Sequence, residues 1–145
     1  SAERREMALA RGAVAVIDPS ADDPVKAIKD LTHGEGADKA LDATSSSDAR
    51  RNAVRCTRAW GTACLVGIGG EVQLEVLPDL IHRQITLVGH CTFSKVGQAD
   101  CARFVSDRKI DVDSLFTHKW QLEDAKEAYQ LFDRQKTGKR VFLPA

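Results

Sequence analysis

The sequence lacks the features that mark a membrane, secreted or nucleic-acid-binding protein. Its 21 Lys and Arg residues equal its 21 Asp and Glu residues, so no basic field is available to hold nucleic acid or anionic lipid. No apolar run approaches the ~20 residues that span a bilayer, and no segment resembles a signal peptide. We therefore expect a soluble, cytoplasmic protein with neither a nucleic-acid nor a membrane partner.

The residue types that build metal and nucleophilic sites lack the spacing that such sites need. No Ser-His-Asp order, nucleophile-elbow motif or Gly-x-Gly-x-x-Gly turn occurs. The histidines show no spacing with Cys, Asp or Glu that would build a metal site. We interpret the four cysteines as reduced and regard Cys64 and Cys91 as small buried apolar residues. The cysteines are Cys56, Cys64, Cys91 and Cys101.

The 145 residues suffice for one domain and an appendage, and they contain alternating helix and strand patterns. The predicted helices cover 3–11, 24–31, 45–58, 78–83, 94–109 and 122–134, and the predicted strands cover 13–17, 38–44, 62–68, 72–76, 85–91, 117–121 and 139–144. Strands that alternate with helices of this length favour parallel βαβ units. The expected fold class is therefore α/β, a doubly wound parallel sheet with helices on both faces.

Particular residues mark the boundaries and the core of these elements. Gly12 is placed to end the first helix, and Asp22 or Asp23 can cap the second one before Pro24. The apolar, β-branched run 13–17 is typical of a buried parallel strand. We expect Trp60 and Trp120 to pack between helix and sheet. Ala49, Asn52, Ala53 and Cys56 are expected to share one helix face.

Short segments along the whole chain resemble the C-terminal part of the medium-chain, zinc-type alcohol dehydrogenases. Each segment is a weak signal alone, but their order and spacing match the family throughout. The segments are 6–13, 14–19, 32–38, 66–68, 85–89, 115–118, 122–125 and 138–139.

This resemblance implies a partial Rossmann sheet that lacks its first βαβ glycine turn, over residues 1–114. Residues 115–145 would then be a strand-helix-strand segment of the catalytic domain. The family transfers a hydride between an alcohol or carbonyl substrate and NAD or NADP, with zinc held by an N-terminal domain that this chain does not include. We expect a fragment that is inactive in isolation, because the missing glycine turn would hold the pyrophosphate.

The resemblance also implies where a cofactor would lie. Thr44 and Ser45 match a loop beside the adenosine half, although the serines there can equally cap a helix. The segment 66–68 matches backbone beside the nicotinamide ribose, and 89–92 matches backbone that bonds the carboxamide. Lys139 matches a basic residue near the pyrophosphate, or else lies in a solvated turn. The implied cofactor-binding residues are Thr44, Ser45, Val66, Gly67, Ile68, Gly89, His90, Cys91, Thr92 and Lys139.

The sequence is also compatible with two other functions. A zinc-free quinone or enoyl reductase of the same superfamily shares the C-terminal pattern. A non-catalytic module derived from a dehydrogenase is the third reading. The resemblance further implies a homodimer joined through the strand Ile85–Cys91, because an edge strand presents backbone donors and acceptors that need a partner.

Overall fold

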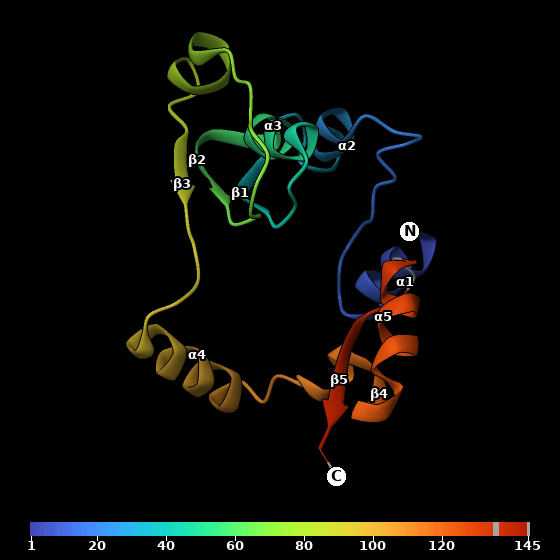
Figure 1. Ribbon diagram of the computed structural model, residues 1–145. Helices are drawn as coiled ribbons and strands as arrows, with labels where there is room; N and C mark the ends of the chain where they lie inside the picture. Colours follow the sequence, from blue (N-terminus) through green and yellow to red (C-terminus); the bar gives the residue numbers. More distant parts are fainter. Residues whose placement is uncertain (135–136, 145) are drawn as a thin grey trace. The chain divides into compact units, whose positions relative to one another are not determined.

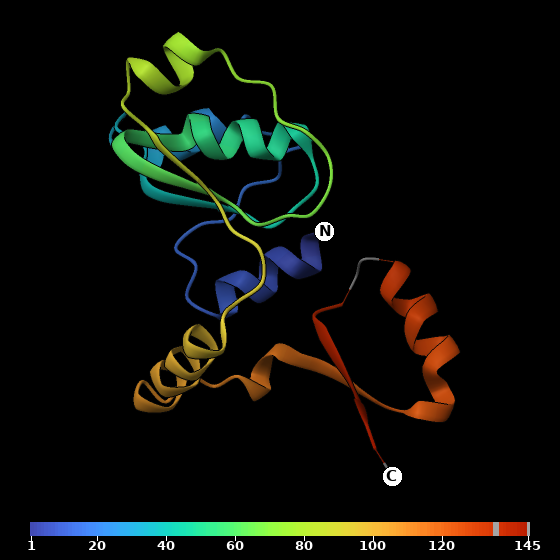
Figure 2. The same ribbon diagram turned by 60° about the vertical axis from the view of Figure 1, so that its left-hand side comes forward.

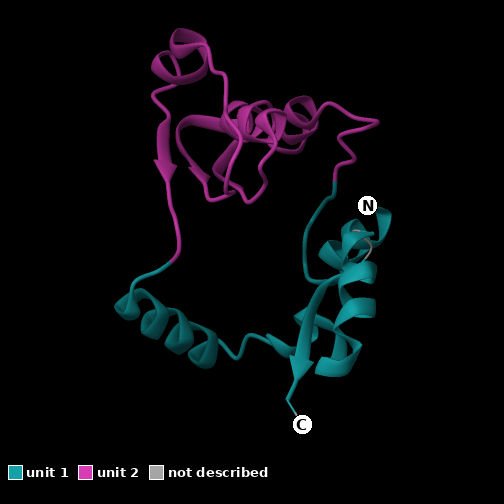
Figure 3. Cartoon of the chain, viewed as in Figure 1, with its two compact units in different colours: residues 1–16, 93–145 teal, residues 17–92 magenta. Residues whose placement is uncertain are grey.

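The computed structural model describes residues 1–134 and 137–144, and the chain divides into two compact units (Figure 3). One unit consists of residues 17–92. The other combines residues 1–16 with residues 93–145. Each unit contains its own parallel sheet, with three strands in the first and two in the second.

The unit of residues 17–92 is built on the strands β1, β2 and β3, which are all parallel and pair in that order. Helix α3 packs against β1 and β2, and α2 packs against α3 (Figures 1 and 2). The elements are α2 (Pro24–Leu31), β1 (Ala37–Asp42), α3 (Ser47–Cys56), β2 (Thr57–Leu65), the π-helix η1 (Val76–Ile81) and β3 (Thr86–Gly89). This arrangement confirms the predicted α/β class with a parallel sheet.

Capping side chains begin both α-helices of this unit. The Asp23 carboxylate accepts hydrogen bonds from the amides of Val25 and Lys26 at 2.8 and 3.2 Å, and Pro24 occupies the first turn. The Ser46 hydroxyl accepts one from the amide of Ala49 at 3.3 Å. Both helix starts therefore follow the local sequence as predicted.

The core of this unit is small and lies around α3 and β2. Val54, Thr57 and Ala63 are fully buried, and the Thr57 hydroxyl donates to the carbonyl of Ala53 at 2.8 Å. The predicted helix face lines a hollow of about 450 Å³ together with residues of β1 and α2. Its members on α3 are Ala49, Asn52, Ala53 and Cys56.

An ion pair between the half-buried Arg55 and the buried Asp79 joins η1 to α3. The Arg55 guanidinium donates to both carboxylate oxygens of Asp79, at 2.8 and 3.0 Å, and Asp79 is 4% exposed. The amide of Glu75 also donates to Asp79, at 2.9 Å. The hydrogen bond from Arg55 is the main reason that the pKa of Asp79 lies below its ordinary value.

Two predicted strands are not strands in the described chain. The run 13–17 forms none, and Val14 is 98% exposed, because no described strand lies beside this run to accept its backbone hydrogen bonds. The run 72–76 forms no strand either, and η1 begins at Val76. An apolar run forms a strand only where a neighbouring strand supplies partners for its backbone hydrogen bonds.

Two residues expected in the core are exposed. Trp60 is 70% exposed with a φ of 63°, in the irregular stretch where the β1–β2 register shifts, so it does not pack between helix and sheet. Cys91 is exposed because β3 ends at Gly89, before it. The ring of Trp120, in contrast, is half-buried and stacks on that of His118 with centroids 6.4 Å apart.

The second unit contains a two-stranded parallel sheet of β4 and β5. Helix α1 contacts the residues just before β5, since the Arg4 guanidinium donates to the carbonyl of Thr137 at 3.2 Å. Apart from the run 13–17, the predicted helices and strands of this unit match described elements, with small shifts at their ends. They are α1 (Ala2–Ala10), α4 (Lys95–Asp107), the 3₁₀ turn η2 (Asp113–Leu115), β4 (Phe116–Gln121), the 3₁₀ turn η3 (Leu122–Asp124), α5 (Ala125–Asp133) and β5 (Lys139–Leu143).

Candidate functional site

The carboxyl ends of the three parallel strands of residues 17–92 lie at one edge of the sheet. Asp42, Leu65 and Gly89 stand side by side in the register of β1, β2 and β3. The loops that follow these strands contain every predicted cofactor-binding residue except Gly89, which is the last residue of β3, and Lys139. Ligands of open α/β sheets bind outside this edge, so these loops form the candidate site.

The loops after β1 and β2 are bound to each other through their backbones. The amides of Val66 and Gly67 both donate to the carbonyl of Asp42, at 2.8 and 3.3 Å. A Cβ atom on Gly67 would lie 1.4 Å from the carbonyl oxygen of Thr44. The contact with Thr44 therefore requires glycine at position 67 whether or not a ligand approaches it.

A buried arginine, which the sequence reasoning did not identify, lies between these two loops. Arg50 of α3 is 5% exposed, and its Nη2 atom donates to the carbonyls of Thr44 and Gly67 at 3.2 and 2.8 Å. Its Nε atom lies 3.5 Å from the carboxylate of Asp42, which is 4% exposed. No direct signal in the sequence pointed to this role, because Arg50 is not among the residues expected to share the buried helix face.

Thr44 and Ser45 contribute to the same loop in different ways. The Thr44 hydroxyl donates to the Asp42 carboxylate at 2.7 Å and accepts from the amide of Ser46 at 3.1 Å. Ser45 is exposed, and its carbonyl would lie 2.3 Å from a Cβ atom on Gly70. Capping of α3 falls to Ser46, so the exposed Ser45 side chain is not used as the cap.

The end of β3 is tied to β2 and then becomes exposed. The amide of His90 donates to the carbonyl of Leu65 at 3.1 Å. The space beside the Cα atom of Gly89 is empty, since a Cβ atom there would meet nothing within 4 Å. Thr92 has a φ of 56°. The predicted cofactor-binding residues at the end of β3 and after it are all exposed. They are Gly89, His90, Cys91 and Thr92.

Lys139 belongs to the other unit. It begins β5, and its ammonium group lies 5.9 Å from the ring centroid of Phe116. The side chain is exposed. The structure thus places Lys139 in a unit separate from the other predicted cofactor-binding residues.

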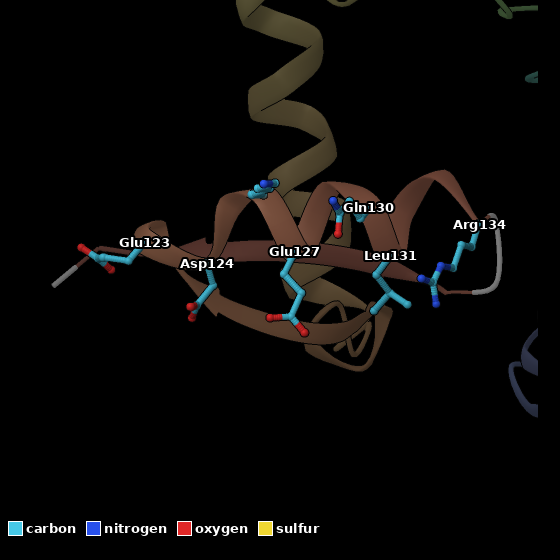
Figure 4. A pocket seen from close by; sticks show the side chains of 7 residues that line it. Glu123, Asp124, Glu127, Gln130, Leu131 and Arg134 are labelled. Atoms are coloured by element: carbon cyan, nitrogen blue, oxygen red, sulfur yellow. The ribbon is translucent and has the colours of Figure 1, made fainter.

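Other features of the described residues do not add a second site. Within residues 1–134 and 137–144, no group of three or more His, Cys, Asp or Glu side chains could hold a metal ion, so these residues do not fit a zinc site. No helix in those ranges is long and apolar enough to cross a membrane. A hollow of about 510 Å³ is lined by residues of η3, α5 and Arg134, and Figure 4 shows Glu123, Asp124 and Glu127 on it.

The sheet and the loops at its carboxyl edge define a Rossmann-like α/β protein. The sequence model of the family described as zinc-binding dehydrogenase matches residues 1–107, and the chain belongs to this family.

Curated relatives are dehydrogenases that are much longer than this chain. It is 38% identical over 114 residues to the uncharacterized zinc-type alcohol dehydrogenase-like protein YphC of Escherichia coli, covering 79% of this chain and 32% of that protein. It is 30% identical over 144 residues to the L-threonine 3-dehydrogenase of Pyrococcus horikoshii, covering 97% of this chain. The chain spans 41% of the length of the threonine dehydrogenase.

Solved structures of alcohol dehydrogenases share the fold. The benzyl alcohol dehydrogenase of Acinetobacter calcoaceticus superimposes with a TM-score of 0.87 at 26% identity, covering 100% of this chain and 41% of that one. The alcohol dehydrogenase of Thermotoga maritima gives a TM-score of 0.86 at 25% identity, with the same coverage.

Proposed function

We propose that this chain is the cofactor-domain part of an NAD(P)-dependent, zinc-type alcohol dehydrogenase that acts on a small alcohol or carbonyl compound. The observation that carries the proposal is the shared register of Asp42, Leu65 and Gly89, which brings three loops to one edge of a parallel sheet. Such an edge is where dinucleotides bind in this fold. The relatives named as alcohol and threonine dehydrogenases support the same reaction class.

The chain's own residues would bind and orient the cofactor at this edge. NAD or NADP, when bound, supplies the acceptor or donor of the hydride. The loop of Thr44 and Ser45 would lie beside the adenosine half, and segment 66–68 beside the nicotinamide ribose. Backbone groups of 89–92 would hold the carboxamide. Lys139 would neutralise the pyrophosphate as a point charge.

The open Gly89 fits a ring system that approaches the backbone closely, because no side chain fills the space above it. Gly67 supports the proposal less directly, since its contact with Thr44 already explains the glycine. The proposed division is a partial dinucleotide-binding domain over 1–114 and a catalytic-domain segment over 115–145. Zinc would belong to the parent enzyme and not to this chain.

Calorimetry with NADH and NADPH tests whether the chain binds cofactor alone. We expect no micromolar affinity and no alcohol oxidation by the isolated chain, because its sequence lacks the Gly-x-Gly-x-x-Gly turn that holds the pyrophosphate. A micromolar dissociation constant would contradict this expectation. The coding sequence around the chain tests the wider proposal, because a zinc-type enzyme would carry zinc ligands in its N-terminal domain.

We also propose a homodimer joined through the edge strand β3. All four residues of β3, Thr86–Gly89, are exposed, and the strand is the last of the three in its sheet. An edge strand with exposed Leu87 and Val88 presents a row of backbone groups and apolar side chains to a partner. A two-fold axis would pair the same strand from each copy.

A further inference from the structure

We propose that Arg50 is a positioning residue that couples the loop after β1 to the loop after β2. One nitrogen of its guanidinium donates to a carbonyl in each loop, Thr44 at 3.2 Å and Gly67 at 2.8 Å. The significance of this coupling for cofactor binding rests on the proposed function. The coupling itself is a property of the chain and is tested separately.

The surroundings of Arg50 make the connection between the loops rigid. The backbone of Gly67 lies against Thr44 so closely that no Cβ atom fits, and a Cβ atom on Gly70 would lie 2.3 Å from the carbonyl oxygen of Ser45. A Cβ atom on Gly70 would also lie 3.1 Å from the Nη1 atom of Arg50. The guanidinium is therefore enclosed by both loops, and a displacement of either loop must move it.

The chemistry of the buried pair of Arg50 and Asp42 favours a positioning role for Arg50 over a stabilising one. A buried ion pair contributes little net stability, because the desolvation of both charges offsets their attraction. Here the Oδ2 atom of Asp42 and the Nε atom of Arg50 make no hydrogen bond within the described residues, although they lie 3.5 Å apart. The two well-formed bonds of Arg50 instead go to the loops.

Site-resolved amide hydrogen exchange on Arg50→Met tests the coupling. We expect the amides of Val66 and Gly67, which donate to Asp42, to exchange at least about tenfold faster, while those of Ala63 and Cys64 change little. Arg51→Met is the matched control, because Arg51 is the next residue on α3 and its ion pair within the described residues is with the exposed Asp48. Equal exchange in the two variants, or uniform acceleration throughout residues 17–92, would overturn the proposal.

A second variant covers the case in which Arg50→Met does not fold. The double substitution Asp42→Asn with Arg50→Met removes the bonds to the loops and leaves no buried unpaired charge. We expect the same local acceleration at Val66 and Gly67 in this variant. If neither variant folds, Arg50 acts through global stability and the positioning role is wrong.

Titration with NADH to millimolar concentration, followed by amide chemical shifts, links the coupling to the proposed function. We expect Ser45, Gly67 and Ile68 to shift in the wild-type chain, and the apparent Kd to rise at least about tenfold in Arg50→Met but not in Arg51→Met. An unchanged Kd would contradict the positioning role. If the wild-type chain shows no shifts, the isolated chain does not bind cofactor, and hydrogen exchange still decides the coupling.

Discussion

Trp60 combines a bulky side chain with a left-handed backbone and high exposure. Its φ is 63°, a region that L-residues other than glycine occupy at a cost of roughly 1–2 kcal/mol. The side chain is 70% exposed, so packing recovers little of that cost. The amide of Trp60 donates to the carbonyl of Arg83 at 2.9 Å, which ties the backbone to the segment before β3.

We therefore predict that Trp60→Gly is more stable to urea than Trp60→Ala, by about 1 kcal/mol. Both substitutions remove the same indole, but only glycine relieves the strain at this φ. Equilibrium unfolding of the two variants measures the difference in free energy. Equal midpoints and slopes would show that the left-handed conformation carries no strain here.

Gly67 is the residue whose replacement should distort the candidate site most directly. Gly67→Ala places a Cβ atom 1.4 Å from the carbonyl of Thr44, so backbone must move. We expect the unfolding free energy to fall by about 1–3 kcal/mol, as for other overpacked positions. Gly89→Ala is the control at the same sheet edge, because its Cβ would meet nothing within 4 Å. Comparable losses in the two variants would contradict the close contact.

At the scale of elements, η1 depends on one carboxylate that is held by α3. The pKa of Asp79 is lowered mainly by its hydrogen bonds from Arg55, so the ionised form stabilises the fold. A lowered folded-state pKa contributes stability above the unfolded value of about 3.9, and this contribution disappears as the pH falls through the folded value.

Asp79→Asn is accordingly predicted to lower the unfolding free energy by about 1–3 kcal/mol at neutral pH. The difference from wild type should be constant above about pH 5 and shrink below about pH 4. Urea unfolding across this range measures it. Asp48→Asn removes a carboxylate whose side chain is 75% exposed and should cost much less. A pH-independent difference between Asp79→Asn and wild type would show that Asp79 acts without its charge.

At the scale of the whole molecule, the edge strand β3 is the surface through which two copies would pair. Val88→Lys places a charge on the exposed edge, and charged edge residues disfavour strand pairing. Light scattering at tens of micromolar should give twice the chain mass for wild type and the chain mass for Val88→Lys. Leu122→Lys, at a residue that is 68% exposed in the other unit, should leave the dimer intact. A monomeric wild-type chain would contradict the dimer.

Local signals predicted most helices and strands because their causes are local. The cap at Asp23 with Pro24, the serine cap before α3 and the period of α5 each depend on residues within one or two turns. The position of the candidate site also followed from the sequence, because strand ends in a parallel sheet must lie at one edge. The runs 13–17 and 72–76 were predicted wrongly because strand formation depends on a neighbouring strand.

The sequence by itself determined the alternation of helices and strands, the helix caps and the family, since these depend on short-range chemistry and on residue order. Only the tertiary structure showed that Arg50 lies between two loops, that Gly67 meets Thr44 and that Trp60 is exposed. Those facts depend on contacts between residues distant in the chain. Whether an arginine is buried, or a glycine required, is decided by which backbone lies against it.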